Sequence, residues 1–333
     1  MNTFGRIFRV HIFGESHGES VGVNIDGCPA GLPLTEDDLL PDLERRKGGK
    51  QKGTTPRQEA DYPIFKSGTF NGKATGFPIT ILFDNANTRS GDYEKQRSFP
   101  RPGHADFTAH VKFGGHEDFR GGGHFSARLT TGLVAAGGIA KKLMPGVTIT
   151  AAVTEIGGET DLEKGLQNAI DAKDSVGGIV ECKVSGLPAG LGEPYFDSVE
   201  SALAHIIFAI PAVRGIEFGT GFAAAKMFGS EHNDAIEDMT GKTTTNHAGG
   251  VVGGISNGNE LVFRLAIKPT SSTPKEQHSL NWETEKMEDF AIRGRHDLCV
   301  ALRAPVIVEA VTAMVLVDFM MLEQRIPRVI ETL

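Results

Sequence analysis

The sequence predicts a mixed α+β fold in which helices are buried against antiparallel sheets. Three observations support this class: strands and helices are interspersed along the 333 residues, hairpin turns outnumber βαβ units, and two helical segments are strongly apolar. A helix that is apolar on nearly every side must be covered all round, and packed sheets provide such cover. No linker rich in Pro, Ser or charge interrupts the chain, so we expect one domain over residues 1–333.

The first half of the chain contains four well-signalled units. Residues 4–25 predict a strand, a glycine-bounded loop and a second strand. Residues 35–49 predict a helix, with a threonine N-cap, acids in the first turn and cations at the end, although Pro41 must lie near its start or kink it. An Asn71-Gly72 turn predicts a hairpin that leads into an apolar strand. A helix of small residues is expected over 126–144, before a Pro-Gly stop.

The second half repeats part of this pattern. The spacing of Asp197 and Glu200 indicates a capping box at the start of a helix. An Asn257-Gly258 turn again precedes an apolar strand, so the two halves hint at a duplicated architecture. Residues 305–324 predict a buried helix, because its two acids, Glu309 and Asp318, argue against a membrane span.

Composition limits the classes of partner and compartment. The formal net charge of −8 disfavours a general nucleic-acid binder. Five cations nevertheless fall within residues 45–52, which favours a small anionic ligand, with a solvated basic loop as the alternative. Cys28, Cys182 and Cys299 form no CxxC pair and no signal peptide precedes them, so a reducing cytoplasm is the expected compartment.

The stretch Gly14–Gly18 places Glu15, Ser16 and His17 between two glycines. The glycines allow dihedral angles that other residues avoid, and a histidine there can exchange a proton near neutral pH. A tight turn with solvent-exposed polar residues is the alternative. This stretch is the first candidate for acid–base chemistry.

A second candidate is the stretch Arg101–Asp106. Its arginine suits a bidentate grip on phosphate or carboxylate, and His104 could act on the group that Arg101 holds. A turn with a surface salt bridge would use the same residues.

Three further clusters combine glycines, cations and hydroxyls. Residues 120–128 place three glycines before a helix start at Ser126, which exposes N–H groups to an anion. Residues 268–272 follow Lys268 with three hydroxyls, a composition suited to phosphate. In residues 293–299 an aspartate lies among cations and should stay ionised, so it could serve as a base. Five such clusters imply a ligand set with several negative charges.

Two competing sites are weaker. His104, His110, His116 and His124 lack known zinc-ligand spacings, so a metal site is disfavoured. Residues 219–224 fit a relaxed dinucleotide loop, but no acid follows about 20 residues later in a second strand.

Taken together, the motifs resemble one family, chorismate synthase. They occur in the family's order, from about residue 4 to residue 324: FGESHG at 13–18, RPGHAD at 101–106, NHAGGVVGGISNG at 246–258, KPTSS at 268–272 and GRHD at 294–297. The resemblance implies a β-α-β sandwich, a helical layer between antiparallel sheets with internal pseudo-symmetry. It also implies a homotetramer. The net charge and the two acids of residues 305–324 predict that neither nucleic acid nor a membrane is a partner.

The resemblance implies a carbon–oxygen lyase. In that reaction 5-enolpyruvylshikimate 3-phosphate loses phosphate and a ring proton by a 1,4-anti elimination and yields chorismate, the last step of the shikimate pathway. Reduced FMN is required without net redox change, and since no reductase domain is evident we expect an external flavin reductant. His17 resembles the acid for the departing phosphate, His104 the residue that protonates or hydrogen-bonds the reduced flavin, and Asp297 the acid that assists removal of the ring proton.

The remaining site residues are also carried over by resemblance. The substrate-binding cations are Arg46, Lys52, Arg101 and Arg128. The flavin-binding residues are His124, Phe125, Ser126, Ala212, Gly253, Lys268, Pro269, Thr270, Ser271, Ser272 and Arg295. The chain departs from the family where His124 replaces arginine, Leu298 replaces proline and Lys52 replaces an arginine common in members.

Two other classes of function stay open at this point. A nicotinamide-dependent oxidoreductase would use residues 219–224 to bind NADPH. A non-catalytic anion-binding protein would use all five clusters for recognition alone.

Overall fold

The computed structural model describes residues 2–49, 51–57, 59–87, 97–292, 294 and 296–331. A five-stranded antiparallel sheet has the order β1-β2-β3-β7-β4. Its strands are β1 Thr3–Phe4, β2 Arg9–Gly14, β3 Ser20–Asp26, β4 Ile64–Ser67 and β7 Ile79–Asp84. β2 and β3 form the predicted strand–loop–strand unit, in which Gly14 pairs with Val21 and residues 15–19 leave the sheet as a loop.

A four-stranded antiparallel sheet has the order β10-β13-β9-β8. Its strands are β8 Thr148–Ile156, β9 Gly178–Ser185, β10 Val213–Phe218 and β13 Leu261–Ile267. Three small hairpins pair β5 Thr69–Phe70 with β6 Lys73–Ala74, β11 Val251–Val252 with β12 Ile255–Ser256, and β14 Glu276–Asn281 with β15 Lys286–Ala291.

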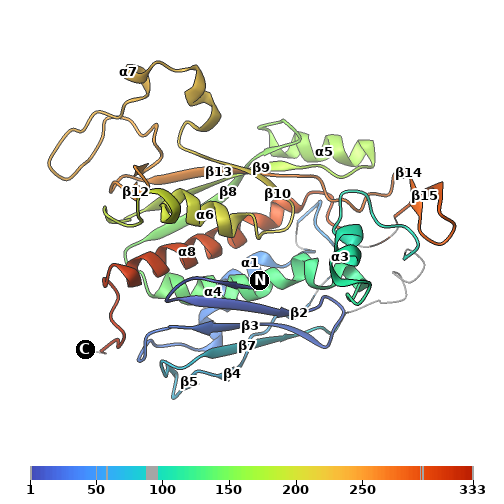
Figure 1. Ribbon diagram of the computed structural model, residues 1–333, viewed down its shortest axis with the longest axis horizontal. Coiled ribbons are helices and arrows are strands. Elements are labelled where there is room, and N and C mark those ends of the chain that lie inside the picture. Colours follow the sequence, from blue (N-terminus) through green and yellow to red (C-terminus); the bar gives the residue numbers. More distant parts are fainter. Residues whose placement is uncertain are drawn as a thin grey trace.

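Two buried helices, α4 Thr130–Lys142 and α8 Ala304–Leu322, lie between the two larger sheets (Figure 1). Helix α4 contacts strand β3, and α8 contacts β8 and β9. The two helices approach closely, since a Cβ on Gly137 would overlap Ala310. Small residues at this crossing therefore allow the dense packing that a core requires.

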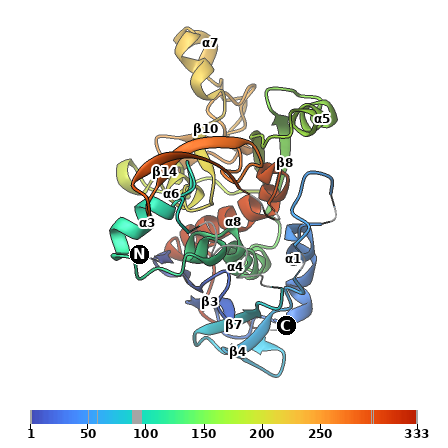
Figure 2. The ribbon, with the colours of Figure 1, turned by 90° about the vertical axis from the view of Figure 1, so that its right-hand side faces the viewer.

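The described part of the chain also forms five other helices, some packed on this core and some outside it (Figure 1). They are α1 Leu40–Arg46, α3 Asp106–Phe113, α5 Leu162–Ala172, α6 Val199–Ile207 and α7 Gly229–His232. Short 3-10 segments span Glu36–Asp38, Arg120–Phe125, Ala127–Leu129, Tyr195–Asp197, Gly221–Lys226 and Val300–Arg303. Figure 2 shows α3 beside strand β14, on the same side of the molecule.

The predicted fold class is confirmed as a mixed α/β architecture with antiparallel sheets. The Asn71-Gly72 hairpin is also confirmed, with φ of 50° and 71° at these residues. The predicted helix over 35–49 is shorter than expected, because Pro41 lies in the first turn of a helix that begins at Leu40. The predicted internal pseudo-symmetry stays a prediction.

The capping prediction at 197–200 was wrong by one residue. Ser198 is the N-cap of α6, and its hydroxyl accepts a hydrogen bond from the N–H of Ser201. Asp197 instead pairs with Arg6. The Asp-x-x-Glu spacing was misleading because a serine in the next position can cap the same helix.

The acids of α8 are satisfied inside the protein. Glu309 accepts two bonds of 2.7 Å from Arg45 and one of 3.0 Å from Lys141, and Asp318 accepts from three consecutive backbone N–H groups at residues 6–8. By length and composition Val300–Leu322 could span a membrane, but 78% of its most apolar window is buried in the fold. We therefore describe it as the core helix of this domain.

Candidate active site

A cavity of about 1010 Å³ opens where strand β2 and the loop after β13 meet the segments that lead into α4 and α8. Among the described residues, eight cationic side chains and four carboxylates line it, so it favours anions. Fourteen of the predicted site residues line this cavity: Arg46, Arg101, His104, His124, Phe125, Ser126, Arg128, Ala212, Lys268, Pro269, Thr270, Ser271, Ser272 and Asp297. Four of the five sequence clusters therefore contribute to one cavity, although its residues lie up to about 250 positions apart in the chain.

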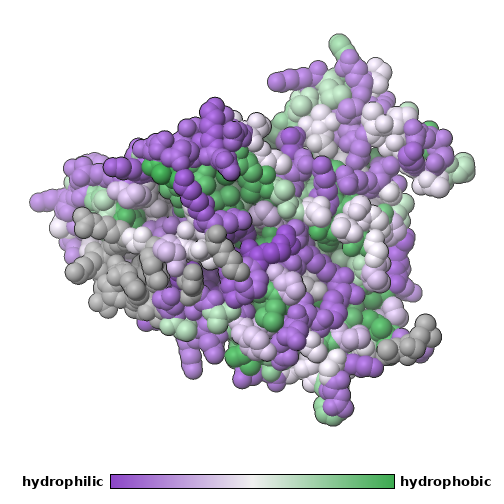
Figure 3. Space-filling model, turned by 180° about the vertical axis from the view of Figure 1, so that it is seen from behind, coloured by the Kyte–Doolittle hydropathy of each residue, from purple (hydrophilic) through white to green (hydrophobic). Residues whose placement is uncertain are grey.

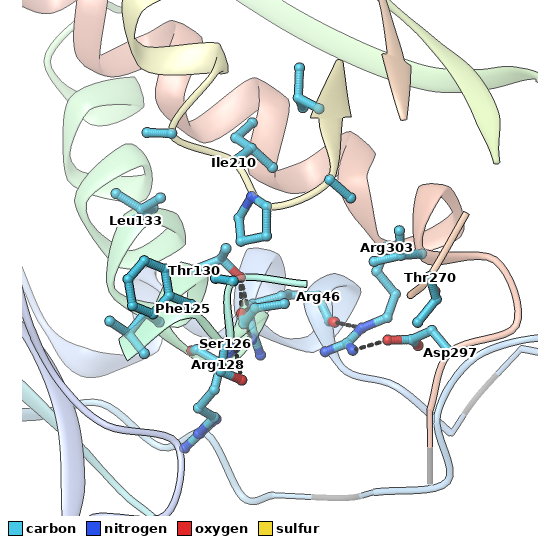
Figure 4. A pocket seen from close by; sticks show the side chains of 18 of the residues that line it. Arg46, Phe125, Ser126, Arg128, Thr130, Leu133, Ile210, Thr270, Asp297 and Arg303 are labelled. Carbon is cyan, nitrogen blue, oxygen red and sulfur yellow. Dashed lines mark hydrogen bonds and ion pairs between the residues drawn. The ribbon is translucent and has the colours of Figure 1, made fainter. Parts of the chain in front are cut away.

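The two sides of the cavity differ in polarity. In Figure 4, Leu133 and Ile210 face the pocket from one side, while Arg46, Arg303 and Asp297 lie on the other. Such a division suits a ligand with an apolar ring and charged substituents.

His104 is held by a charged network. Its Nδ1 lies 2.6 Å from Oδ1 of Asp106, and Arg101 donates to both oxygens of Asp106 at 2.7 and 2.8 Å. Although burial opposes ionisation, the hydrogen bonds from Arg101 and His104 hold the pKa of Asp106 well below its ordinary value. The carboxylate therefore fixes Nδ1 as the donor and leaves Nε2 of His104 as the nitrogen available to a ligand. The alternative interpretation of this stretch expected a salt bridge on the surface. Arg101 and Asp106 do form an ion pair, but Arg101 lies in the wall of the cavity.

A glycine loop lies between the two predicted catalytic histidines. Gly121 has a φ of 60°, and a Cβ on it would overlap the ring of His17. A Cβ on Gly122 would lie 3.3 Å from the ring of His104. His17 itself is 8% exposed and lies behind Gly121, which lines the cavity. Burial of this histidine excludes the alternative of a solvent-exposed turn.

The loop that carries His17 is tied down on several sides. The N–H of Ser16 donates to the carbonyl of Gly123, and Arg57 donates to the Ser16 hydroxyl at 3.1 Å. The side-chain amide of Asn85 donates to the carbonyls of Glu15 and Gly18. These bonds restrict the position of the imidazole relative to the cavity.

Two buried arginines share one carboxylate. Nη1 of Arg46 lies 3.2 Å from one oxygen of Asp61, and Arg128 pairs with the other oxygen. Burial, and next the nearby charge of Arg303, lowers the pKa of Arg46 to about 9, so it stays cationic at neutral pH. Arg128 also reaches Asn85, at 2.9 Å, and so connects this pair to the His17 loop.

Asp297 is oriented by a backbone N–H and a guanidinium. Its Oδ1 accepts from the N–H of Thr55 at 2.8 Å, and its Oδ2 accepts from Arg303 at 3.1 Å. Arg303 also donates to the carbonyl of Arg46, and Figure 4 shows both contacts. The predicted partner, Arg295, lies outside the described residues, and the cation that contacts Asp297 within them is Arg303.

The loop after β13 gathers hydrogen-bond donors. Nζ of Lys268 donates to the Gly103 carbonyl at 2.7 Å and lies 2.8 Å from the Ser271 hydroxyl. Burial, and then the charge of Arg214, lowers the pKa of Lys268. Within the part of the chain that the structure describes, the buried Thr270 hydroxyl has no hydrogen-bond partner. Because such a group is costly to bury alone, it fits a position that a ligand completes.

Of the predicted residues that the structure describes, three do not line the cavity, and His17, behind Gly121, is one of them. Lys52 donates to Gln167 of α5 at 2.8 Å on the exposed surface, and Gly253 lies in the turn between β11 and β12.

Two departures from the family pattern are accommodated by hydrogen bonds to the backbone. His124 bonds to the Gly14 carbonyl at 2.9 Å, and the N–H of Leu298, which proline would lack, donates to the Gly53 carbonyl.

Several residues of the site were missed. Arg57, Asp61, His296 and Arg303 line the cavity, and no motif in the sequence marked the first two. Burial, and then the charge of Arg101, lowers the pKa of His296 to about 4. His296 could have been noticed, because it lies between Arg295 and Asp297 in a recognised motif.

The geometry disfavours the dinucleotide alternative. The N–H of Phe222, in the proposed phosphate loop 219–224, donates to the carboxylate of Glu217 at 2.9 Å. A carboxylate thus occupies the place that a phosphate would need. In the part of the chain that the structure describes, no group of three or more His, Cys, Asp or Glu could hold a metal ion.

Comparison with known proteins gives one consistent result. The family model described as chorismate synthase matches residues 8–321. A chorismate synthase of Chitinophaga pinensis is 69% identical over 330 residues, covering 99% of each chain, and one of Methanosarcina mazei is 43% identical over 96% of each. A solved structure titled as a chorismate synthase crystal structure superposes with a TM-score of 0.73 at 25% identity, covering 96% of this chain and 93% of that one. The chain belongs to the chorismate synthase family of carbon–oxygen lyases.

Proposed function

We propose that this protein catalyses the 1,4-anti elimination of phosphate from 5-enolpyruvylshikimate 3-phosphate to give chorismate. Membership of the family supports this reaction. The observation that carries the proposal is that His104, Lys268 and Asp297, from three separate segments, border one cavity with an excess of cations. A substrate with one phosphate and two carboxylates requires such an excess.

The residues present fit a flavin mononucleotide in the same cavity. Lys268 and Ser271 supply donors for a phosphate, and the apolar side near Ile210 suits a planar ring. The Thr270 hydroxyl lacks a partner among the residues that the structure describes. The flavin would be held by His124, Phe125, Ser126, Ala212, Gly253, Lys268, Pro269, Thr270, Ser271, Ser272 and Arg295. In its reduced form FMN supplies electron density transiently while the C–O bond breaks, with no net redox change.

Proton transfers are assigned to two histidines and a carboxylate. His17, behind Gly121, is the proposed acid for the departing phosphate. His104 is the proposed hydrogen-bond partner of the reduced flavin through Nε2, because the carboxylate of Asp106 holds its Nδ1. Asp297 assists removal of the ring proton, since each of its oxygens keeps an acceptor lone pair beyond the bonds from Thr55 and Arg303.

The substrate would be held by the cations on the polar side of the cavity. Arg46 and Arg128 are fixed by Asp61, and Arg101 is fixed by Asp106, so these guanidiniums are preorganised before the substrate binds. Lys52, the fourth proposed cation, donates to Gln167 outside the cavity in this structure.

We further propose a cytoplasmic homotetramer supplied with reduced flavin by an external reductant. An arm, residues 219–250, stands away from the rest of the chain (Figure 1), and Figure 3 shows it from behind. Its Phe222, Phe228, Ile236 and Met239 are exposed by 72–102%, an arrangement that a subunit interface would bury. The chain is proposed to be one domain over 1–333, a β-α-β sandwich with internal pseudo-symmetry.

An anaerobic phosphate-release assay tests the proposed function. Purified protein with 5-enolpyruvylshikimate 3-phosphate should release phosphate when reduced FMN is added, and oxidised FMN is the matched control. Binding of both ligands without phosphate release would instead support a purely binding protein. Tight binding of NADPH by flavin-free protein would support the oxidoreductase alternative.

A further inference from the structure

A second cavity, of about 660 Å³, lies between α3 and the β14–β15 hairpin. Figure 2 shows these elements side by side. Arg101, His104 and Phe125 line both this cavity and the first one, so the two spaces share a wall. The proposed reaction assigns no ligand to the second cavity.

The second cavity has the opposite charge to the first. Five carboxylates line it, against the guanidiniums of Arg97 and Arg101. The carboxylates are those of Asp106, Glu117, Asp118, Glu283 and Glu285. An excess of negative charge repels phosphates and carboxylates, so this space is not an extension of the anion site.

The walls of the second cavity are aromatic. Phe107 and Trp282 lie with ring centroids 6.3 Å apart, and His110 packs on Trp282 at 4.9 Å. Phe99 and Phe119 also line the cavity. Aromatic faces attract both flat apolar ligands and organic cations.

Glu117 carries an unsatisfied atom in this cavity. Its Oε1 lies 3.3 Å from Nδ1 of His110, whereas its Oε2 is buried and has no hydrogen-bond partner among the described residues. Leaving a buried acceptor unpaired costs about 1–3 kcal/mol, and more for a charged group. The charge of Glu117 is therefore only partly compensated by its neighbours, which adds to the attraction of this wall for a cation.

We propose that the second cavity binds a small organic cation with an aromatic body. Its ammonium group would be attracted by the carboxylates around Glu117, and its ring would pack against Phe107 and Trp282. The site goes beyond the proposed lyase function and does not depend on it. Since His104 and Asp106 also line the cavity, the bound cation would be positioned to influence that pair.

The test uses fluorescence, because Trp282 is the only tryptophan in the chain. The full-length flavin-free protein is titrated with 2-phenylethylammonium, and separately with 3-phenylpropionate, which has a similar body and the opposite charge. We expect a saturable change in Trp282 emission with the cation, and an affinity for the anion at least about 10-fold lower.

Two matched variants separate local from general charge effects. Glu117→Gln removes the charge of Glu117 with little change in size and should weaken cation binding at least about 10-fold. Glu276→Gln removes the same charge from an exposed position of β14 outside the cavity, and should leave the affinity unchanged.

Equal affinity for cation and anion, or no saturable response to either, would overturn the proposal. Unchanged cation affinity in a folded Glu117→Gln protein, as judged by circular dichroism, would overturn it as well. The comparison of the two ligands uses the unmodified protein, so it decides the question even where Glu117→Gln does not fold.

Discussion

Gly121 and His17 are in direct contact across two segments that are about 100 residues apart in the chain. The glycine has φ of 60°, and any Cβ at this position would overlap the imidazole. The neighbouring Gly122 lies against His104 in the same way, at 3.3 Å from a built Cβ. Because Gly121 and Gly122 have no side chains, the loop fits between His17 and His104 and sets the distance between the two rings.

Replacement of Gly121 by alanine should displace His17 and lower turnover about 100-fold, the size of effect that misplacing a catalytic group produces. The matched control is Gly72→Ala, since Gly72 has φ of 71° but nothing within 4 Å of its Cβ position. In both variants alanine must adopt a positive φ, which costs about 1–3 kcal/mol. Only in Gly121→Ala does the new Cβ also overlap the ring of His17. Equal losses of phosphate release in the two variants would show that contact with His17 is irrelevant.

His17→Ala should keep flavin binding and lose about 10²–10⁴-fold in turnover, as expected for loss of a general acid. The control is His11→Ala, because His11 lies on an exposed position of β2 and bonds to Thr3. Phosphate release and flavin titration are measured on the same preparations. A fully active His17→Ala protein would remove the acid role from this residue.

Asp61→Asn should destabilise the protein by about 3–5 kcal/mol, because the buried Arg46 and Arg128 would lose their shared carboxylate. Asparagine tolerates the φ of 50° at this position, so the change isolates the charge. Asp26→Asn breaks an exposed pair with Arg9 and should cost only about 0–1 kcal/mol. Urea unfolding measures both, and similar losses would contradict the buried-pair argument.

Lys268→Ala should weaken FMN binding at least about 10-fold, because the variant removes a cation from the donor cluster with Ser271 and Gly103. Lys66→Ala removes the same charge from an exposed position of β4 and should leave the affinity unchanged. Flavin fluorescence gives the two dissociation constants. If they are alike, the flavin phosphate does not lie at Lys268.

His296 should stay neutral until the pH falls toward 4, whereas an unfolded histidine titrates near 6.5. Between these values the unfolded chain binds more protons, so this residue's contribution to stability is complete above pH 6.5 and is lost as the pH falls to about 4. The loss amounts to about 3 kcal/mol. NMR titration of the imidazole measures the pKa, and unfolding at several pH values should show a weaker acid dependence in His296→Gln. An imidazole pKa near 6.5 in the folded protein would contradict this account.

Much of the architecture could be predicted from local patterns. The Asn71-Gly72 hairpin formed because these residues adopt positive φ at low cost, and α8 is buried because it has no polar face to present to water. The cap of α6 was misassigned because Asp197 and Ser198 are both capping residues, and only the path of the preceding chain selects Ser198.

The sequence by itself determined which chemistry is available: the histidines, cations, glycines and hydroxyls of the five clusters, and through them the family. Only the tertiary structure decided how these groups are partnered. It paired Asp297 with Arg303, gave Arg46 and Arg128 a common carboxylate in Asp61, and left Lys52 and Gly253 away from the cavity. The physical reason is that motifs record local propensity and residue type, whereas ion pairs and burial depend on contacts between segments far apart in the chain.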